Sequence, residues 1–258
     1  PLRLPEFAQV SRFTTEEEPR VLTEFRDFLV EVRNNRPSTI AKATKCLATI
    51  LRWAEDRGFS GSLLLYKSTS ACKFAGGDHP TLQVDEIADI NSLQLKPGSV
   101  RWHVQQTFLL MCATAQRYSD LHKIDPNLWK ERGQTIVQVK TGSPAIIMHN
   151  DEVRAILQQY GNTEWPAVIL PSKTGKMTKN SKFNLTLKSL CKEAGLNRAI
   201  PTTRYEKGTP IIEDVPLWQR ISTHTGRRTF ITQNLTSGAT QTVVALQTGH
   251  TDMKQLRP

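Results

Sequence analysis

The sequence has 258 residues, of which 38% are hydrophobic and 22% are charged, and its formal net charge at pH 7 is +10. This length is enough for one large domain or two modest domains, each with its own core. No apolar run approaches the ~18 residues that cross a bilayer, so a membrane-spanning protein is not expected. The N-terminal residues lack the pattern of a signal peptide, and a chain that begins with Pro1 is predicted to be a fragment or a processed form.

The excess of positive charge favours a polyanionic partner, and nucleic acid is the leading one. The alternative is an ordinary basic protein with no particular partner. Several Lys and Arg residues occur beside Ser, Thr and Asn, the residue types that contact phosphates, although such mixtures are also typical of solvated loops. The predicted DNA-binding residues are Lys42, Lys45, Lys67, Lys73, Lys173, Lys176, Lys179 and Arg228.

The four cysteines, Cys46, Cys72, Cys112 and Cys191, lie far apart and form no C-x-x-C motif. Cys46 and Cys112 fall within apolar periodic segments, which predicts reduced cysteines in a core. We therefore expect an intracellular protein, cytoplasmic and nucleoid-associated in a bacterium or nuclear in a eukaryote.

Two amphipathic helices are predicted near the N-terminus. Residues 14–32 begin with Thr and acidic residues and continue with apolar residues at helical spacing. Those apolar residues are Val21, Leu22, Phe25, Phe28, Leu29 and Val32. Residues 36–58 predict a second helix with a basic outer face, with Ser38 as its N-cap and Gly58 as its stop. The Gly-rich and Ser-rich stretch that follows indicates an interdomain connection, with the boundary near residues 76–80.

The rest of the chain predicts further helices and one hairpin. In residues 135–149, two β-branched runs flank a T-G-S-P turn, which is the mark of a β-hairpin. The expected fold class is therefore mainly α with a small antiparallel β-sheet. Helical spacing recurs in residues 84–90, 100–115, 151–160, 181–195, 227–238 and 240–250.

Two basic residues in this part are candidates for chemistry. Arg117, in A-T-A-Q-R-Y-S-D-L, directly follows a buried helix, where an unpaired guanidinium is costly and therefore needs an anion. Asp120 could be that anion, in which case the ion pair would be purely structural and Arg117 would have no role in catalysis. Lys140 precedes the hairpin turn, from which its ammonium can reach outward, but a solvated turn lysine is the ordinary interpretation.

Two further candidates lie near helix ends. In T-H-T-G-R-R-T-F, His224 and Arg227 are three residues apart at a helix start, so both side chains can point to one site that the helix N-terminus also serves. The same spacing arises by chance in a basic chain. In Q-T-G-H, Gly249 ends a helix and His250 follows it, and a C-capping turn with an incidental histidine is the simpler explanation.

In this order the motifs resemble the tyrosine recombinase family, the integrases of phages and mobile elements. R-Y-S-D-L stands where the family has R-x-S-D/E-L, H-T-G-R stands for its H-x-x-R, and T-G-H stands for its L-G-H. A lysine before a hairpin turn completes the pattern, and I-S-T-H-T-G-R-R-T-F is its most specific piece. The resemblance extends from about Leu82 to the end, and more loosely over the helix after Pro37.

The resemblance implies a domain organisation and a partner. Residues 82–258 would form the catalytic domain, residues 76–81 the linker, and residues 1–75 a helical DNA-binding module like the family's core-binding domain. That module is incomplete if only two helices are present, since the family usually has four. The implied partner is double-stranded DNA, on which up to four copies of the chain would assemble, with no cofactor, no metal and no membrane.

The resemblance also implies a role for each candidate residue. Arg117 and Arg227 would hold the nonbridging oxygens of a phosphodiester, and Asp120 would support them. Lys140 would protonate the leaving 5′-hydroxyl, assisted by His224, while His250 would bind the phosphate.

In this family a tyrosine about nine residues after the G-H histidine attacks phosphorus and forms a 3′-phosphotyrosine, so that strands are rejoined without ATP. That position falls just beyond Pro258, and none of Tyr66, Tyr118, Tyr160 and Tyr205 occupies it. The 258-residue chain is therefore expected to bind DNA without cleaving it.

Two other functions share part of this pattern. One is a type IB topoisomerase, against which the short basic N-terminal helices and the H-T-G-R-R-T-F segment argue. The other is a DNA-binding regulator with a decayed site. A tyrosine in the sequence that follows Pro258 would favour an enzyme over the regulator.

Overall fold

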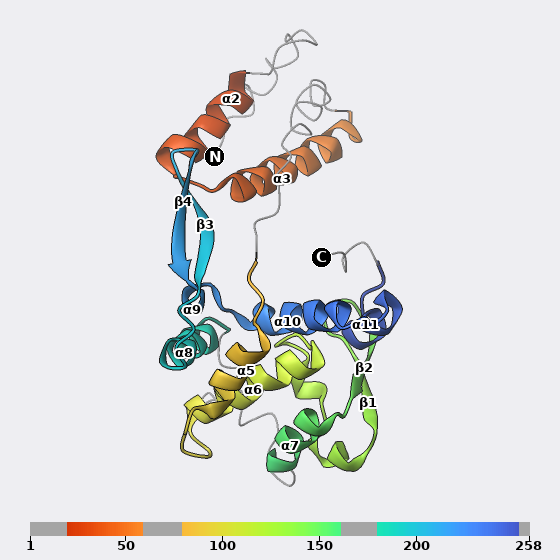
Figure 1. The fold of residues 1–258 in the computed structure, drawn as a ribbon. Coiled ribbons are helices and arrows are strands. Elements are labelled where there is room, and N and C mark those ends of the chain that lie inside the picture. Colours follow the sequence, from red (N-terminus) through yellow and green to blue (C-terminus); the bar gives the residue numbers. More distant parts are fainter. Residues whose placement is uncertain (1–19, 59–78, 161–179, 253–258) are drawn as a thin grey trace. The chain divides into compact units, whose positions relative to one another are not determined.

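The computed structural model describes residues 20–58, 79–160 and 180–252 (Figure 1). The chain divides into two compact units, one formed by residues 1–78 with 201–214 and the other by residues 79–200 with 215–258. None of the helices within the described ranges is long and apolar enough to cross a membrane.

The first unit begins with α2 (Arg20–Asp27), which continues into the π-helical turn η2 (Phe28–Val32). In this turn the Arg33 N–H donates to the Phe28 carbonyl at 3.0 Å, one residue further apart than in an α-helix. The wider turn changes the helical phase. Leu29 is buried, but Phe28 and Val32, which were expected on the same apolar face, are exposed.

The helix α3 (Pro37–Glu55) has Arg36 at its N-cap, so the prediction of Ser38 as the cap was wrong. Proline is suited to the first helical position because its φ is fixed and its missing N–H is not needed there. Gly58 lies three residues beyond Glu55, with φ +80°.

The cysteines differ in their surroundings. Cys46 is exposed on α3, where Thr44, Ala48 and Leu51 fill the buried positions, so the expectation of a core cysteine there was wrong. Cys112 and Cys191 are buried, as expected. Cys72 lies outside the described residues.

A second hairpin, formed by β3 (Ala199–Glu206) and β4 (Thr209–Pro216), was not predicted. Its two-residue turn has positive φ at Lys207 (45°) and Gly208 (79°), as a type I′ turn requires. Pro201 and Pro210 lie within the strands and weaken the strand signal in the sequence. Near the hairpin tip, the Lys207 N–H donates to Asn34 Oδ1 at 2.8 Å, within the first unit.

The second unit is built around α6 (Val100–Thr114), which is buried over most of its length. The helices α5 (Val84–Ser92), α7 (Asp151–Tyr160), α8 (Asn180–Glu193) and α10 (Thr223–Thr236) pack against it (Figure 1). The core that they share includes Ile90, Phe108, Leu110, Leu157 and Leu187. The short elements η3 (Leu121–Lys123), η4 (Pro126–Lys130) and α9 (Leu217–Arg220) complete its connections.

The predicted hairpin is present as β1 (Gly133–Val137) and β2 (Pro144–Met148). The strands are antiparallel, with Gly133 opposite Met148 and Val137 opposite Pro144, so residues 138–143 form the turn. The last helix, α11 (Gln241–Thr248), packs beside β2. The hairpin thereby brings its turn toward the C-terminal part of the described chain.

At Gly226 the backbone of α10 lies close against α6. A Cβ at this position would lie 3.0 Å from Met111 Cβ and 3.3 Å from the Cys112 nitrogen. The absent side chain lets the first turn of α10 lie directly on α6. This contact sets the position of His224 and Arg227, which flank the glycine.

Replacing Gly226 by valine should lower the free energy of unfolding by about 1–3 kcal/mol, because overpacking forces the two helices apart. Thr232→Val introduces the same side chain at an exposed position of α10 and should have a much smaller effect. Thermal unfolding of both variants, followed by circular dichroism, measures the difference. Equal melting temperatures for the two variants would contradict the close contact.

Candidate active site

A cavity of about 400 Å³ lies where the end of α6, the β1–β2 turn, α8 and the start of α10 meet. Four of the five residues predicted to be catalytic line it, and the described residues of its wall include no Asp or Glu. The lining residues are Met111, Gln116, Arg117, Tyr118, Ser119, Lys140, Asn180, Thr223, His224 and Arg227.

Arg117 is placed by the end of α6. The helix stops at Ala115, whose left-handed φ of 58° turns the chain. The Arg117 guanidinium donates from Nη1 to the side-chain oxygen of Gln138 and lies 3.8 Å from Asp120 Oδ2. The local ion pair considered above is therefore present, and the guanidinium faces the cavity as well.

Asp120 is fully buried and joins two of the candidate segments. Its Oδ1 accepts the Val139 N–H at 2.7 Å, next to Lys140 in the chain. Its Oδ2 has no hydrogen-bond partner among the described residues and faces Arg117. One carboxylate thus ties the β1–β2 turn to the end of α6.

Arg227 is 5% exposed and held by neutral acceptors. Its Nη1 donates to the Ala115 carbonyl at 2.8 Å, and its Nη2 donates to the Thr248 carbonyl at 2.6 Å. Burial lowers its pKa to about 10, and the positive charge of Arg117 adds to this effect, while Asp120 opposes it. The group remains a cation at neutral pH, and the bonds to these two carbonyls leave its charge available to an anion.

His224 lies in the first turn of α10. The start of this helix is fixed by a capping box between Ser222 and Thr225 and by the Thr223 N–H, which donates to Asn184 Oδ1 at 2.9 Å. Desolvation lowers the pKa of His224, and the neighbouring cations Arg228, Arg227, Arg117 and Lys140 lower it further. The ring therefore favours the neutral state.

His250 follows Gly249, which ends α11 with a left-handed φ of 65°. The Thr248 hydroxyl donates to the Val244 carbonyl at 2.6 Å and lies 2.8 Å from His250 Nδ1. Because the Thr248 hydroxyl proton already goes to the Val244 carbonyl, the hydroxyl oxygen can only accept from His250, so Nδ1 carries the ring proton. The unprotonated Nε2 then accepts from Arg227 Nη2 at 3.2 Å. Burial, followed by Arg227 and Arg117, lowers the His250 pKa to about 4.

Lys140 is exposed on the β1–β2 turn, and its side chain contributes to the cavity wall. Its charge is among the causes of the lowered His224 pKa. A flexible ammonium at the mouth of a cationic cavity can reach a phosphate or a leaving oxygen.

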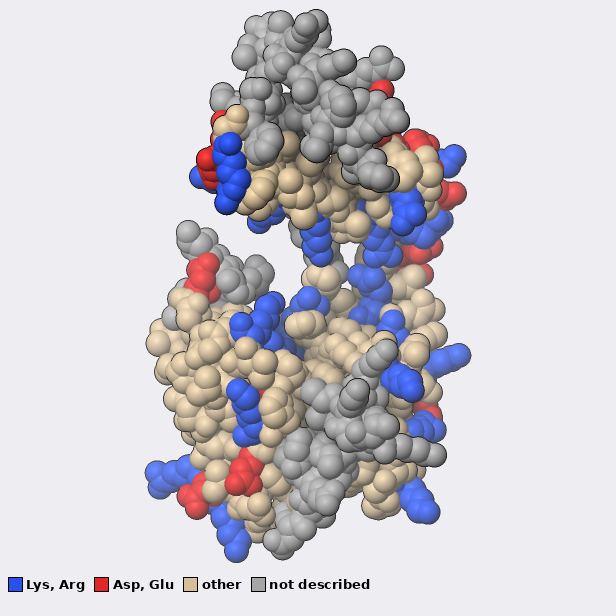
Figure 2. All heavy atoms as spheres, turned by 180° about the vertical axis from the view of Figure 1, so that it is seen from behind, with Lys and Arg blue, Asp and Glu red and all other residues tan. Residues whose placement is uncertain are grey.

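The predicted DNA-binding residues fall into three groups. Lys42 and Lys45 are exposed on α3, and Arg228 is half-buried beside His224. Figure 2 shows Lys and Arg side chains spread over the visible face of both units. The remaining predicted residues lie outside the described ranges, and they are Lys67, Lys73, Lys173, Lys176 and Lys179.

Sequence analysis missed the neutral polar residues that hold these side chains. Gln138 and Gln116 are buried beside Arg117, and Asn184 caps the backbone at the start of α10. A signal for Gln138 was present, because it continues the alternation of β1 two residues after the buried Ile136. A polar residue at a core-facing strand position must find hydrogen-bond partners there.

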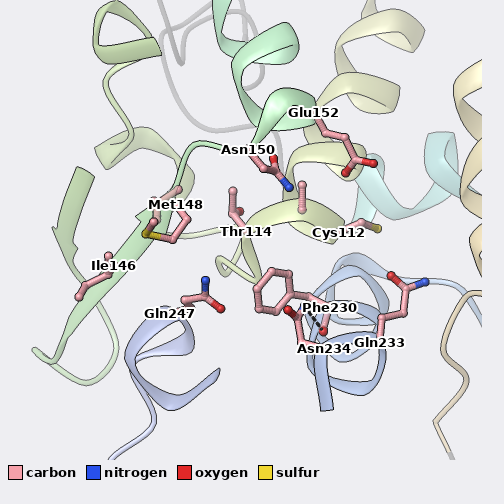
Figure 3. A pocket seen from close by; sticks show the side chains of 12 residues that line it. Cys112, Thr114, Ile146, Met148, Asn150, Glu152, Phe230, Gln233, Asn234 and Gln247 are labelled. Atoms are coloured by element: carbon pink, nitrogen blue, oxygen red, sulfur yellow. Dashed lines mark hydrogen bonds between the residues drawn. The ribbon is translucent and has the colours of Figure 1, made fainter. Parts of the chain in front are cut away.

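A second cavity, of about 300 Å³, lies among β2, α6, α10 and α11 (Figure 3). Its wall combines apolar side chains such as Met148 and Phe230 with the amides of Asn234 and Gln247, and Glu152 is the one charged residue among the lining residues that the structure describes. A carboxylate without a cation does not suit a phosphodiester. Within the described ranges, no group of three or more His, Cys, Asp or Glu side chains is placed to hold a metal.

A mostly helical domain that presents two arginines, a hairpin lysine and a histidine around one cavity, with a second histidine bonded to one of the arginines, has the architecture of a tyrosine recombinase catalytic domain. Residues 80–257 match the model of the phage integrase family, and the chain belongs to that family. The resemblance and the fold class inferred from the sequence are thereby confirmed, and neither the topoisomerase nor the regulator alternative is favoured. No curated protein matches the sequence.

Solved structures share the fold at low sequence identity. The integrase of transposon Tn1549, in complex with a circular intermediate DNA, is 14% identical, with a TM-score of 0.64 over 91% of this chain and 79% of that one. A lambda integrase (75–356) dimer bound to a COC′ core site is 15% identical, with a TM-score of 0.62 over 95% of this chain and 81% of that one.

The lowered pKa of His250 predicts a stability change in acid. The folded value of about 4 lies below the ordinary 6.5, so the unfolded chain binds more protons between these two pH values. The free energy of unfolding should therefore decrease as the pH falls from about 6.5 towards about 4. His224 should contribute in the same direction.

Melting temperatures measured across this pH window check the prediction. The His250→Asn variant should lose less stability on acidification than the parent protein does. An unchanged pH dependence in the variant would show that His250 is not held in its neutral form.

Proposed function

We propose that this protein is a site-specific DNA recombinase that cleaves and rejoins strands of duplex DNA through a 3′-phosphotyrosine intermediate, without metal or ATP. The observation that carries the proposal is the cationic cavity, whose wall presents two guanidiniums, an ammonium and an imidazole and, within the described part of the chain, no carboxylate. Membership of the phage integrase family supports it.

The two arginines would stabilise the transition state. When an oxygen nucleophile attacks phosphorus, negative charge builds up on the nonbridging oxygens. Arg227 is held by backbone carbonyls, and Arg117 is held by the Gln138 amide and the Asp120 carboxylate, before the substrate arrives, so little reorganisation is needed during the reaction. Their remaining N–H groups can donate charge-assisted hydrogen bonds to those oxygens.

Proton transfer would involve the other three residues. Attack by a tyrosine oxygen forms the new P–O bond as the bond to the 5′-oxygen breaks, and the leaving oxygen takes a proton from the Lys140 ammonium. His224, with its lowered pKa, would accept a proton or relay one at the cavity wall. His250, hydrogen-bonded to Arg227, would bind or orient the phosphate.

The nucleophile is proposed to be a tyrosine in the sequence that follows Pro258. Tyr118 lines the cavity, but its ring packs against Phe183 at a centroid distance of 4.9 Å, and burial raises its pKa to about 12. A phenol that ionises so reluctantly is a poor nucleophile. Tyr66 lies outside the described residues.

Double-stranded DNA is the proposed partner, with several copies of the chain, up to four, assembled on one recombination site. Two solved structures with the same fold support this, namely the Tn1549 integrase in complex with a circular intermediate DNA and a lambda integrase dimer bound to a core site. The proposed location is with the chromosome, in the cytoplasm of a bacterium or the nucleus of a eukaryote. Residues 1–75 are proposed to form a DNA-binding module and residues 82–258 the catalytic domain, with residues 76–81 as the linker.

Covalent trapping tests the proposed chemistry. The chain extended through the residues that follow Pro258 in its gene is incubated with a nicked substrate that carries the cognate site, and a denaturing gel reports the protein–DNA adduct. We expect an adduct from the extended chain and none from the 258-residue chain. Arg117→Ala or Arg227→Ala should slow adduct formation by about 10²-fold or more, with duplex affinity little changed.

An extended chain that contains a tyrosine but forms no adduct would overturn the proposed function. An adduct at near-parent rate in either alanine variant would overturn the assignment of that arginine. Tyr118→Phe in the extended chain is the matched control and should react normally.

Binding should depend steeply on salt, because each neutralised phosphate releases condensed counterions. Replacing Lys42 and Lys45 together by glutamine should weaken binding to all duplex sequences alike and reduce the slope of log K against log salt by about 0.9 for each lost phosphate contact. Fluorescence anisotropy at several salt concentrations measures both effects. Lys130→Gln, an exposed lysine of the second unit outside the predicted set, is the control, and an equal loss there would contradict the assignment.

A further inference from the structure

We propose that Gln138 is a positioning residue that holds the Arg117 guanidinium, the turn that carries Lys140 and the segment that leads to His250 in register with one another. This inference rests on the proposed function. It adds to the site an uncharged residue that does not belong to any of the sequence motifs. Gln138 is 1% exposed and lies between β1 and the turn that leads to β2.

The Gln138 amide contacts three candidate segments at once. Its Oε1 accepts from Arg117 Nη1 and from Thr141 Oγ1, the latter at 3.1 Å. Its Nε2 donates to the Thr248 carbonyl at 2.8 Å. Arg117, the residue next to Lys140 and the residue two before His250 therefore share one side chain.

The orientation of the amide follows from its neighbours. The guanidinium of Arg117 only donates, and the Thr248 carbonyl only accepts. With the amide turned over, N–H groups would face the guanidinium and an oxygen would face the carbonyl. The positions of the amide oxygen and the amide nitrogen are therefore fixed by their partners. A shorter side chain or an apolar one would not supply both the acceptor for Arg117 and the donor to Thr248.

The same amide connects the two arginines indirectly. The Thr248 carbonyl accepts from Gln138 Nε2 and also from Arg227 Nη2, at 2.6 Å. The chain of contacts runs from Arg117 through Gln138 and Thr248 to Arg227. A carboxylate at position 138 would cancel part of the positive charge that a phosphate needs, whereas a neutral amide orients both cations and preserves their charge.

The surrounding backbone is shaped around this side chain. A Cβ on Gly249 would lie 2.7 Å from the Gln138 side-chain carbon Cδ and from its Oε1. The Gln138 N–H donates to the Ser143 carbonyl at 2.9 Å, and its own carbonyl accepts from the Gly142 N–H at 3.0 Å, which closes the turn around Lys140. Both the main chain and the side chain of Gln138 thus fix the cavity wall.

Gln138→Leu in the extended protein tests the assignment. The variant should bind the duplex with nearly parental affinity, but single-turnover adduct formation should fall by about 10²-fold, the cost of misplacing a reacting group by about an ångström. Gln105→Leu is the matched control. It removes another buried glutamine, whose Nε2 donates to the Ile90 carbonyl at 2.7 Å, and it should affect stability alone.

A double-mutant cycle distinguishes positioning from general destabilisation. Arg117→Lys keeps a positive charge but loses the planar group that Gln138 contacts, so adding Gln138→Leu to it should cost far less than in the parent. The effect of Gln105→Leu should simply add to that of Arg117→Lys, because the two residues do not share a contact in this site. If Gln138→Leu does not fold, Gln138→Met serves in its place, since it keeps an uncharged side chain of similar length and loses both the acceptor for Arg117 and the donor to Thr248.

Near-parent adduct formation by the folded Gln138 variant, or full additivity with Arg117→Lys, would overturn the inference while leaving the proposed function intact. Absence of an adduct from the parent itself would overturn the proposed function and this inference with it.

Discussion

The site depends on one constraint, which is that two positive charges must be held close together. Arg117 and Arg227 line one cavity, and the pKa of Arg227 is lowered first by burial and then by the positive charge of Arg117. Carbonyl and amide oxygens hold them, from Ala115, Thr248 and Gln138, with Asp120 at a longer distance. The carbonyl and amide dipoles offset the repulsion without adding a negative charge, and only Asp120, beside Arg117, supplies one among the groups named here, so net positive charge remains at the site.

The rest of the second unit places these dipoles. The left-handed end of α6 turns the Ala115 carbonyl toward Arg227, and the left-handed end of α11 presents Thr248. The contact at Gly226 holds the first turn of α10 against α6, which keeps Arg227 within reach of both carbonyls. Helix termini leave such carbonyls unpaired within their own helices, and the site uses them as acceptors for a buried cation.

Local patterns in the sequence were sufficient for the helices around α6 and the β1–β2 hairpin, and they singled out four residues that the fold brings to one cavity. They failed where the surrounding structure overrides the preference of the local sequence. Phe28 and Val32 share helical spacing with the buried Leu29 but are exposed around a π-helical turn, and Pro201 and Pro210 concealed the β3–β4 hairpin. Cys46 lies in an apolar segment but on the face of α3 that is exposed to solvent. The spacing of apolar residues in so short a segment did not show which face is buried.

The sequence by itself determined the family, the mainly helical fold and the identity of the charged residues, because each of these depends on short motifs with fixed spacing. Only the tertiary structure decided which neutral groups hold them. Gln138, Gln116 and Thr248 come from three segments more than 20 residues apart, and nothing in their local sequence requires them to meet. Their hydrogen bonds form only after α6, the hairpin and α11 are packed together, because packing is what brings distant donors and acceptors within bonding distance.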